Sequence, residues 1–523
     1  MMLRSLGTLT YQVLRVLDQP VKTPLDGKPR GVALVLSLIT IVILSTAVIE
    51  FTYASRVSTA MATNERDNLK SYFLAKSGVN LSRLLLGFQY ALQAESRETD
   101  DEMGQMIGRA MRRSNFQLYQ YVDLLMGPFN SGRVEIPLAS IDLQGMGVGG
   151  FGEFTGRFDV DVEPEEGRID LNKFAQEEIT DEMLIEICTM LLDERYDWLF
   201  ERHDNVGDLM DRGAIIQNIV NYIDLNEEAI LLTDECTIQG TGGDERRAYD
   251  RDDRHENQPR NTRLAHVEEL HMVHGINEDF MEVFGDSFTV YNVGRPNLNV
   301  ARAPVFYSVL CQNIQIDGQR LEGVSVCSQS PQISIQILYL SLALDGIRAF
   351  FENPLSVLMA YVGSTESKLL PSAQVGQPVA FLSVSQLPMY IQDLKNDPLL
   401  MAQFIGHSPA YQRMVMEQPN LMIDPLSPNF PNWTAEFHRS GLMRSVTTRT
   451  PMIFRIRSTG RYGNSQVEIE AVIDFSKTIR RLPDERIILE RESNEEIAEE
   501  LRQALREERE QMPRGRVLYW RVE

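Results

Sequence analysis

Basic residues are scarce in this chain of 523 residues, which has 51 Lys and Arg against 74 Asp and Glu. The formal net charge is -23, and it becomes -26 without residues 1–31, because that segment holds five basic and two acidic residues. So acidic a protein repels nucleic acid and anionic membrane surfaces, and it suits cation binding. We therefore expect no nucleic-acid partner.

The motifs of common enzyme classes are also missing. The sequence has no G-x-S-x-G, no Walker loop, and no G-x-G-x-x-G between a predicted strand and helix. Paired carboxylates are abundant, but in so acidic a chain they do not discriminate between functions. The sequence therefore predicts a non-catalytic protein.

Cysteine is rare, with only Cys188, Cys236, Cys311 and Cys327. Four cysteines allow three pairings if two bridges form. Cys311 and Cys327 lie at the ends of a predicted strand-loop-strand segment and are the expected bridge in an oxidising periplasm. Buried free thiols are the alternative for that pair, and more so for Cys188, which lies in a helical pattern.

Charged residues are absent from Val32 to Ile49, and proline is absent from Val32 to about Gln93. Eighteen helical residues span about 27 Å, which is close to the thickness of a hydrocarbon core. Apolar residues continue at helical spacing as far as Phe88. We predict one helix of about sixty residues, half in lipid and half outside it.

The segment before this helix is a basic leader, with Arg4, Arg15, Lys22, Lys28 and Arg30 against Asp18 and Asp26. The positive-inside rule predicts a single-pass inner-membrane protein with a cytoplasmic N-terminus and a periplasmic main body after Glu50. A secretory signal would close with a small-residue cleavage site, but Ser45-Thr46-Ala47 leads into further apolar residues. A cut on the near side, at Gly31, fits the sequence better.

Several segments form an ordered set: Arg30-Gly31-Val32-Ala33-Leu34-Val35-Leu36, Leu74-Ala75-Lys76-Ser77-Gly78-Val79, and residues 158–172, 219–226, 268–276 and 296–301. In this order they resemble segments of the minor pseudopilins of type II secretion, specifically the K family, also called general secretion pathway protein K. The resemblance covers residues 30 to about 305 and returns more weakly at 454–475.

This resemblance implies cleavage by a prepilin peptidase after Gly31 and methylation of the new amino terminus at Val32. The fifth mature position is Leu36, where most pilins and pseudopilins carry Glu, and K subunits depart in a similar way. A Glu buried in lipid is costly unless it pairs with the terminal ammonium of the next subunit, so a subunit at the filament tip gains nothing from it.

The function that the resemblance implies is a structural one, that of a tip subunit that primes assembly of the pseudopilus for protein export. The implied partners are I-like and J-like minor pseudopilins, the major pseudopilin and the inner-membrane assembly platform. Two alternatives remain. One is a minor pilin of a type IV pilus or competence system, and the other is a membrane-anchored periplasmic binding module.

An acidic segment is the candidate metal site. The family binds calcium in this region, and the resemblance carries over to Asp224, Asn226, Asp244 and Glu245. Calcium takes six to eight oxygen ligands in flexible geometry, which suits carboxylates and carbonyls from two loop arms. The alternative is a solvated acidic loop. His271 and His274 share one face of a predicted helix, but no HExxH order accompanies them, so zinc is not expected.

The predicted fold class is α+β, with a type IV pilin-like N-terminal helix, an antiparallel sheet and a large inserted helical domain. Its parts are the leader (1–31), the helix (32–95), the first part of the pilin-like domain (96–175), the helical domain (176–290), strands with an unassigned extension (291–450), and a closing hairpin with a helix-strand tail (451–523).

Local patterns predict the elements within these parts. Alternation predicts hairpins at 158–172, around Pro164-Glu165-Glu166-Gly167, and at 452–475, and further strands at 288–293, 297–300 and 517–522. Helical spacing predicts helices at 177–199 and 206–223, a helical hairpin at 264–285 that turns at Gly275, and a surface helix at 493–505. Residues 145–152 and 224–262 are predicted loops.

Overall fold

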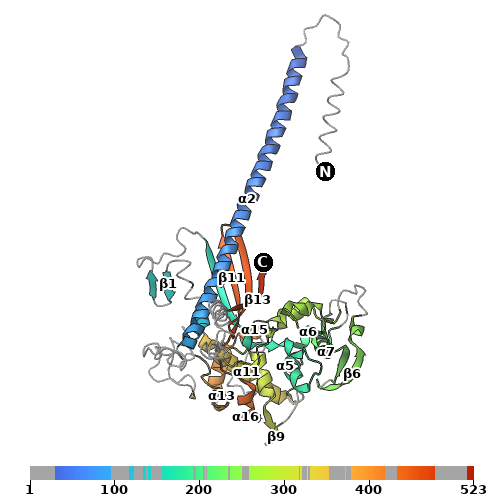
Figure 1. Ribbon diagram of the computed structural model, residues 1–523, viewed down its shortest axis with the longest axis vertical. Coiled ribbons are helices and arrows are strands. Elements are labelled where there is room, and N and C mark those ends of the chain that lie inside the picture. The colour runs from blue at the N-terminus through green and yellow to red at the C-terminus, as the bar shows by residue number, and fades with distance from the viewer. Residues whose placement is uncertain are drawn as a thin grey trace, which may run out of the picture. The chain divides into compact units, whose positions relative to one another are not determined.

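The computed structural model describes most of the chain after the leader (Figure 1). The described residues are 30–95, 117–122, 126, 133–136, 139–142, 156–192, 196–203, 207, 209–233, 236–249, 258–316, 319–320, 327, 330–352, 371–372, 379–417, 433–476 and 515–523. The predicted loop at 145–152 and helix at 493–505 lie outside these ranges.

One helix, α2 (Arg30–Glu95), runs for 66 residues, and it confirms the long N-terminal helix. Its first part lies in a compact unit that ends at Asp67, and its second part lies in the unit Asn68–Glu523. Most large apolar side chains in the first part are exposed, with exposed fractions from 44% for Ile39 to 77% for Phe51. A helix whose apolar side chains find no core in its own chain is suited to lipid or to other helices.

A four-stranded antiparallel sheet in the second unit has the order β13-β12-β11-β3. The strands are β3 (Arg157–Pro164), β11 (Ile453–Tyr462), β12 (Ser465–Asp474) and β13 (Arg516–Val522). β11 and β12 form the predicted closing hairpin, with Tyr462 opposite Ser465 and Gly463 at φ 60° in the turn. The predicted strand at 517–522 is also confirmed and pairs with β12.

The second part of α2 packs on this sheet (Figure 1). Leu74, Ala75, Val79, Leu86 and Tyr90 are buried and share a hydrophobic core with the aromatic rings of Phe158, Phe454 and Phe475. The approach is close at Gly460, where an added Cβ would lie 2.0 Å from the Ser71 carbonyl oxygen. Helix and sheet together give the α+β, pilin-like fold that the sequence predicts.

A large helical domain is inserted between β3 and β11. Its helices are α5 (Asp181–Leu191), α6 (Asp197–Phe200), α7 (Arg212–Ile223), α8 (Glu278–Phe284), α9 (Ala303–Cys311), α11 (Pro331–Glu352), α13 (Gln386–Asn396), α14 (Pro398–His407), α15 (Pro409–Glu417) and α16 (Arg439–Ser445). One hydrophobic core runs through it from Ile169 to Val446, across the predicted boundary at 290. The described residues of the segment 306–450, which the sequence left unassigned, are therefore mainly helical and complete this core.

The predicted hairpin at 158–172 is wrong. β3 pairs with β11, whereas β4 (Ile169–Asp170) pairs in parallel with β7 (Phe288–Thr289). Between them the 3-10 helix η3 (Glu165–Gly167) is buried, because its side chains bind partners far along the chain. Glu166 Oε1 accepts backbone N–H groups of Met452 and Ile453, and Glu165 binds Arg455 at 2.7 Å.

Other local predictions also need correction. The segment 224–262 contains a hairpin, β5 (Glu228–Leu232) with β6 (Ile238–Asp244), which glycine-rich sequence and weak alternation conceal. The predicted strand at 297–300 is a turn, since Asn297 Oδ1 and its carbonyl oxygen accept nearby backbone N–H groups. Of the predicted strand at 288–293, only 288–289 pair.

The predicted helical hairpin at 264–285 is only partly α-helical. Its first arm is the 3-10 helix η7 (Val267–Met272), and its second arm is α8. Gly275 lies between them at φ 89°, a conformation that glycine adopts without strain. Two smaller sheets complete the structure: β1 (Arg133–Ile136) with β2 (Ala139–Asp142), and β10 (Glu436–Phe437) with β8 (Ile314–Ile316) and β9 (Gln319–Arg320).

Candidate cation site in the inserted domain

The base of the β5–β6 hairpin brings two acidic segments together. Helix α7 ends at Ile223, Asp224 caps it in an extended conformation, and the chain then turns into β5. Glu228 pairs with Asp244 across the hairpin, and the Glu245 N–H lies 3.5 Å from the Glu227 carbonyl oxygen. Residues that are about twenty positions apart in the sequence thus become neighbours, as the sequence predicted for the two loop arms.

Two carboxyl groups are buried at this base. Asp224 is 0% exposed and Glu245 is 4% exposed. Burial, followed by repulsion from Glu245, raises the pKa of Asp224, and burial also raises the pKa of Glu245. Two carboxylates removed from water and facing each other are unfavourable without a compensating positive charge.

Three oxygen atoms at this place have no hydrogen-bond partner among the described residues. They are Asp224 Oδ1, Glu245 Oε1 and Asn261 Oδ1, and each is buried. Asn261 donates through Nδ2 to Glu245 Oε2 at 3.0 Å and to the Asn226 carbonyl oxygen. The three residues therefore supply a set of hard oxygen atoms, which is the ligand type that calcium prefers.

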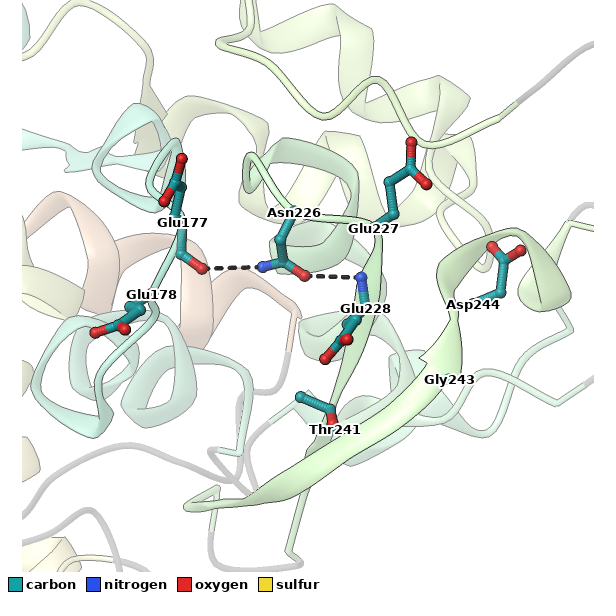
Figure 2. A pocket seen from close by; sticks show the side chains of 8 residues that line it. All are labelled: Glu177, Glu178, Asn226, Glu227, Glu228, Thr241, Gly243 and Asp244. Atoms are coloured by element: carbon teal, nitrogen blue, oxygen red, sulfur yellow. Dashed lines mark hydrogen bonds between the residues drawn. The ribbon is translucent and has the colours of Figure 1, made fainter.

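Asn226 holds the turn rather than lying open to a ligand. Its Nδ2 donates to the Glu177 carbonyl oxygen at 3.1 Å, and its Oδ1 accepts the Glu228 N–H at 2.7 Å (Figure 2). The same Nδ2 also donates to Asp224 Oδ2 at 3.1 Å. Through these bonds Asn226 orients Asp224 and ties the start of β5 to the segment before α5.

Asp244, in contrast to the buried pair, is exposed. Its Oδ1 accepts the Arg246 N–H at 3.0 Å and so caps the short helix η6 (Glu245–Ala248). Of the four predicted ligands, the structure thus brings together Asp224 and Glu245, places Asn226 beside them, and leaves Asp244 exposed. Asn261, which was not predicted from the sequence, is the third residue with a buried oxygen atom at this site.

Asp244 instead lines an open hollow of about 880 Å³ with other acidic side chains (Figure 2). The lining residues are Glu177, Glu178, Asn226, Glu227, Glu228, Thr241, Gly243 and Asp244. Their carboxylates point in different directions in Figure 2 and do not converge on one point. Their summed charge attracts cations to this end of the hairpin.

Both cysteine pairs form disulfides. The first joins Cys188 in α5 to Cys236 in the β5–β6 turn, and so ties the hairpin to the helical core. The alternative of a free thiol at Cys188 is therefore wrong, and the partner Cys236 was not identified because the hairpin that carries it was not predicted. The second joins Cys311, the last residue of α9, to Cys327, which is the pair that the sequence singled out.

The predicted processing residues lie at the start of α2. Gly31 and Val32 are in its first turn, and Leu36 follows one turn later with its side chain 51% exposed. A second helix, residues 332–352 of α11, is also apolar enough to span a membrane, but 67% of it is buried in the inserted domain. Among the described helices, α2 is therefore the better candidate for a membrane anchor.

His271 and His274 do not share a metal site in the described structure. His271 Nε2 lies 3.9 Å from a Glu278 carboxylate oxygen, whereas the His274 ring packs beside Tyr249 at 5.9 Å between centroids. They are not on one helical face, since η7 ends at Met272. No group of three or more His, Cys, Asp or Glu side chains suited to a metal occurs in the described part of the chain. A cation at Asp224 and Glu245 would therefore also need amide and carbonyl oxygens.

Comparison with known proteins finds a likeness among solved structures. No protein-family model and no curated protein matches the chain. Among solved structures, it is similar to a chain in the crystal structure of the GspK-GspI-GspJ complex from the type 2 secretion system of enterotoxigenic Escherichia coli. The sequence identity is 12%, the TM-score is 0.33, and the match covers 81% of this chain and 97% of that chain. The fold assignment rests on the helices and strands described above.

Proposed function

We propose that this protein is a non-catalytic minor pseudopilin of the type II secretion pseudopilus, placed at the filament tip. One observation carries the proposal. A single 66-residue helix is apolar and exposed at its start and packs on an antiparallel sheet at its end. The exposed part suits the membrane before assembly and neighbouring helices afterwards, because both environments bury apolar side chains.

Leu36 supports the place at the tip. Its side chain lies on the exposed apolar part of α2 and is uncharged. Leu36 therefore cannot form an ion pair with the terminal ammonium of a subunit above it, and a subunit at the tip has none above it. The partners are then I-like and J-like minor pseudopilins, the major pseudopilin and the inner-membrane assembly platform. The leader charges favour a cytoplasmic N-terminus and a periplasmic main body.

Calcium is the cation that suits the inserted domain. Asp224, Glu245 and Asn261 would hold it, because each has a buried oxygen atom without a hydrogen-bond partner among the described residues. Bound calcium supplies the positive charge that two buried carboxylates require. It would thereby stiffen the base of the β5–β6 hairpin, whose other end is held by Cys188–Cys236.

Mass analysis of the N-terminus tests this proposal. The full-length protein is produced with its own prepilin peptidase, extracted from the membrane and digested. We expect a first residue Val32 that carries a methyl group, and we expect a Gly31→Leu variant to retain residues 1–31. An amino terminus at Met1 in the unsubstituted protein would overturn the assignment.

A further inference from the structure

One stretch of this acidic chain contains no acidic residue. From residue 437 to residue 467 there is no Asp or Glu, and the stretch carries six arginines: Arg439, Arg444, Arg449, Arg455, Arg457 and Arg461. The segment 287–316 is also free of acidic residues and carries Arg295 and Arg302. Both segments are therefore basic in a protein whose net charge is -23.

Three of the six arginines are neutralised inside the molecule. Arg455 binds Glu165 and Glu470, Arg457 binds Asp286 and Glu470, and Arg461 lies 3.9 Å from Asp159. In contrast, Arg439, Arg444 and Arg449 are exposed, and none of them forms an ion pair with another described residue. Internal pairing therefore accounts for the arginines of β11 and not for those before it.

Side chains of the segment 295–297 hold the backbone of two of these exposed arginines. Arg295 Nη1 donates to the Arg444 carbonyl oxygen at 2.8 Å, and Asn297 Nδ2 donates to the Arg449 carbonyl oxygen at 2.6 Å. Arg295 is itself exposed and forms no ion pair within the described ranges. We call Arg295, Arg444 and Arg449 the arginine patch.

The backbone under the arginine patch is fixed. Thr447 donates its N–H to the Pro296 carbonyl oxygen, and Leu298 donates its N–H to the Thr447 carbonyl oxygen, both at 2.9 Å. Asn297 and Val446 are buried beneath the surface. Guanidinium groups on a rigid platform lose less conformational entropy on binding than groups on a loose loop.

We propose that the arginine patch docks a carboxylate-rich surface of a partner protein. Arginine presents N–H donors in a planar fork that matches a carboxylate, and exposed donors without an internal acid are available for one. Nucleic acid fits less well, because its extended phosphate chain would meet the acidic remainder of this protein. The inference does not depend on the pseudopilin assignment or on calcium.

A labelled hexaglutamate peptide is the probe, and the full-length protein in neutral detergent is the receptor. Fluorescence anisotropy measures binding at low ionic strength and at about 150 mM salt, where exposed charges are screened beyond about 8 Å. We expect Arg444→Glu/Arg449→Glu to weaken binding roughly tenfold or more, since two attractive contacts become repulsive. The matched control, Arg157→Glu/Arg413→Glu, reverses the charge of two exposed arginines outside the patch. It should change the affinity for the peptide by less than about twofold.

Three results would overturn the proposal: no binding of the peptide at low salt, equal loss in both double variants, or tighter binding of a DNA duplex of equal charge. If Arg444→Glu/Arg449→Glu fails to keep the unfolding midpoint of the unsubstituted protein, the Gln pair takes its place, with a loss of about threefold expected. The binding assay uses the protein alone, and peptide binding should persist in chelator. Its outcome is therefore independent of whether the pseudopilin assignment holds.

Discussion

Replacing Glu166 by Gln should stabilise the protein above neutral pH. Burial, only partly offset by the backbone N–H groups of Met452 and Ile453, raises the pKa of Glu166 from 4.5 to about 7. Its Oε2 is buried without a partner among the described residues. Because the folded pKa lies above the unfolded value, the folded protein binds more protons between about pH 4.5 and 7, and stability falls as pH rises through that interval.

The magnitude follows from the two pKa values. The difference between the unfolded pKa of 4.5 and the folded pKa of about 7 corresponds to a loss of stability of about 3 kcal/mol on ionisation. This loss is complete only at pH values above the folded pKa. Gln is uncharged at every pH, and its Oε1 can still accept both N–H groups. Glu166→Gln should therefore gain about 3 kcal/mol at pH 8 and almost nothing at pH 4.

Thermal unfolding of the full-length protein at pH 4, 6 and 8 measures this effect. For a unit of this size, about 3 kcal/mol corresponds to a rise of about 3 °C in the midpoint. Glu165→Gln is the control, because the Glu165 carboxylate is paired with Arg168 and Arg455. Removing the charge of Glu165 should therefore destabilise the protein by about 3–5 kcal/mol. Equal effects of both substitutions, or a Glu166→Gln gain that is the same at pH 4, would refute the reasoning.

Three further predictions concern the inserted domain. Calcium at about 100 times its Kd should stabilise the protein by about 2.7 kcal/mol, and Asp224→Asn should abolish the rise in unfolding midpoint that calcium gives over chelator; an unchanged rise would contradict the site. Cys188→Ser with Cys236→Ser should cost about 2–4 kcal/mol in denaturant unfolding, because the 48-residue separation is no longer closed in the unfolded chain; a loss below about 1 kcal/mol would contradict this. Gly346→Ala should destabilise the protein by at least about 3 kcal/mol, since the added Cβ would lie 1.7 Å from the Phe404 carbonyl oxygen. Gly406→Ala is the control, because its Cβ would meet open space, and it should be neutral or stabilise by up to about 1 kcal/mol. Equal unfolding midpoints for the two variants would contradict this prediction.

The long helix and the closing hairpin were predictable because their signals are local. The absence of proline after Val32 and the alternation from Ile453 to Asp474 each specify one element without reference to the rest of the chain. The role of Pro164-Glu165-Glu166-Gly167 was not predictable in this way. Alternation on both sides indicated a hairpin, but the strand partner of β3 lies about 290 residues further along the chain.

The candidate cation site was predictable only in part. Asp224 and Glu245 stand in the acidic segment that the sequence marked, and the β5–β6 hairpin brings them together. Asp244 and Glu245 are adjacent, and their sequence alone does not decide which one faces inward. Asn261 gave little signal, since a single asparagine in a polar segment is common, and its place beside Glu245 depends on tertiary packing.

Assembly with minor pseudopilins tests the central claim most directly. The full-length protein is produced together with the candidate I-like and J-like subunits and extracted in neutral detergent. Size-exclusion chromatography with light scattering then measures the molar mass of the eluted species, in calcium and again in chelator. Our account predicts a 1:1:1 complex in calcium that is weakened in chelator. A protein that elutes alone in both buffers would contradict the tip assignment, and the membrane-anchored binding module would then be the function to test.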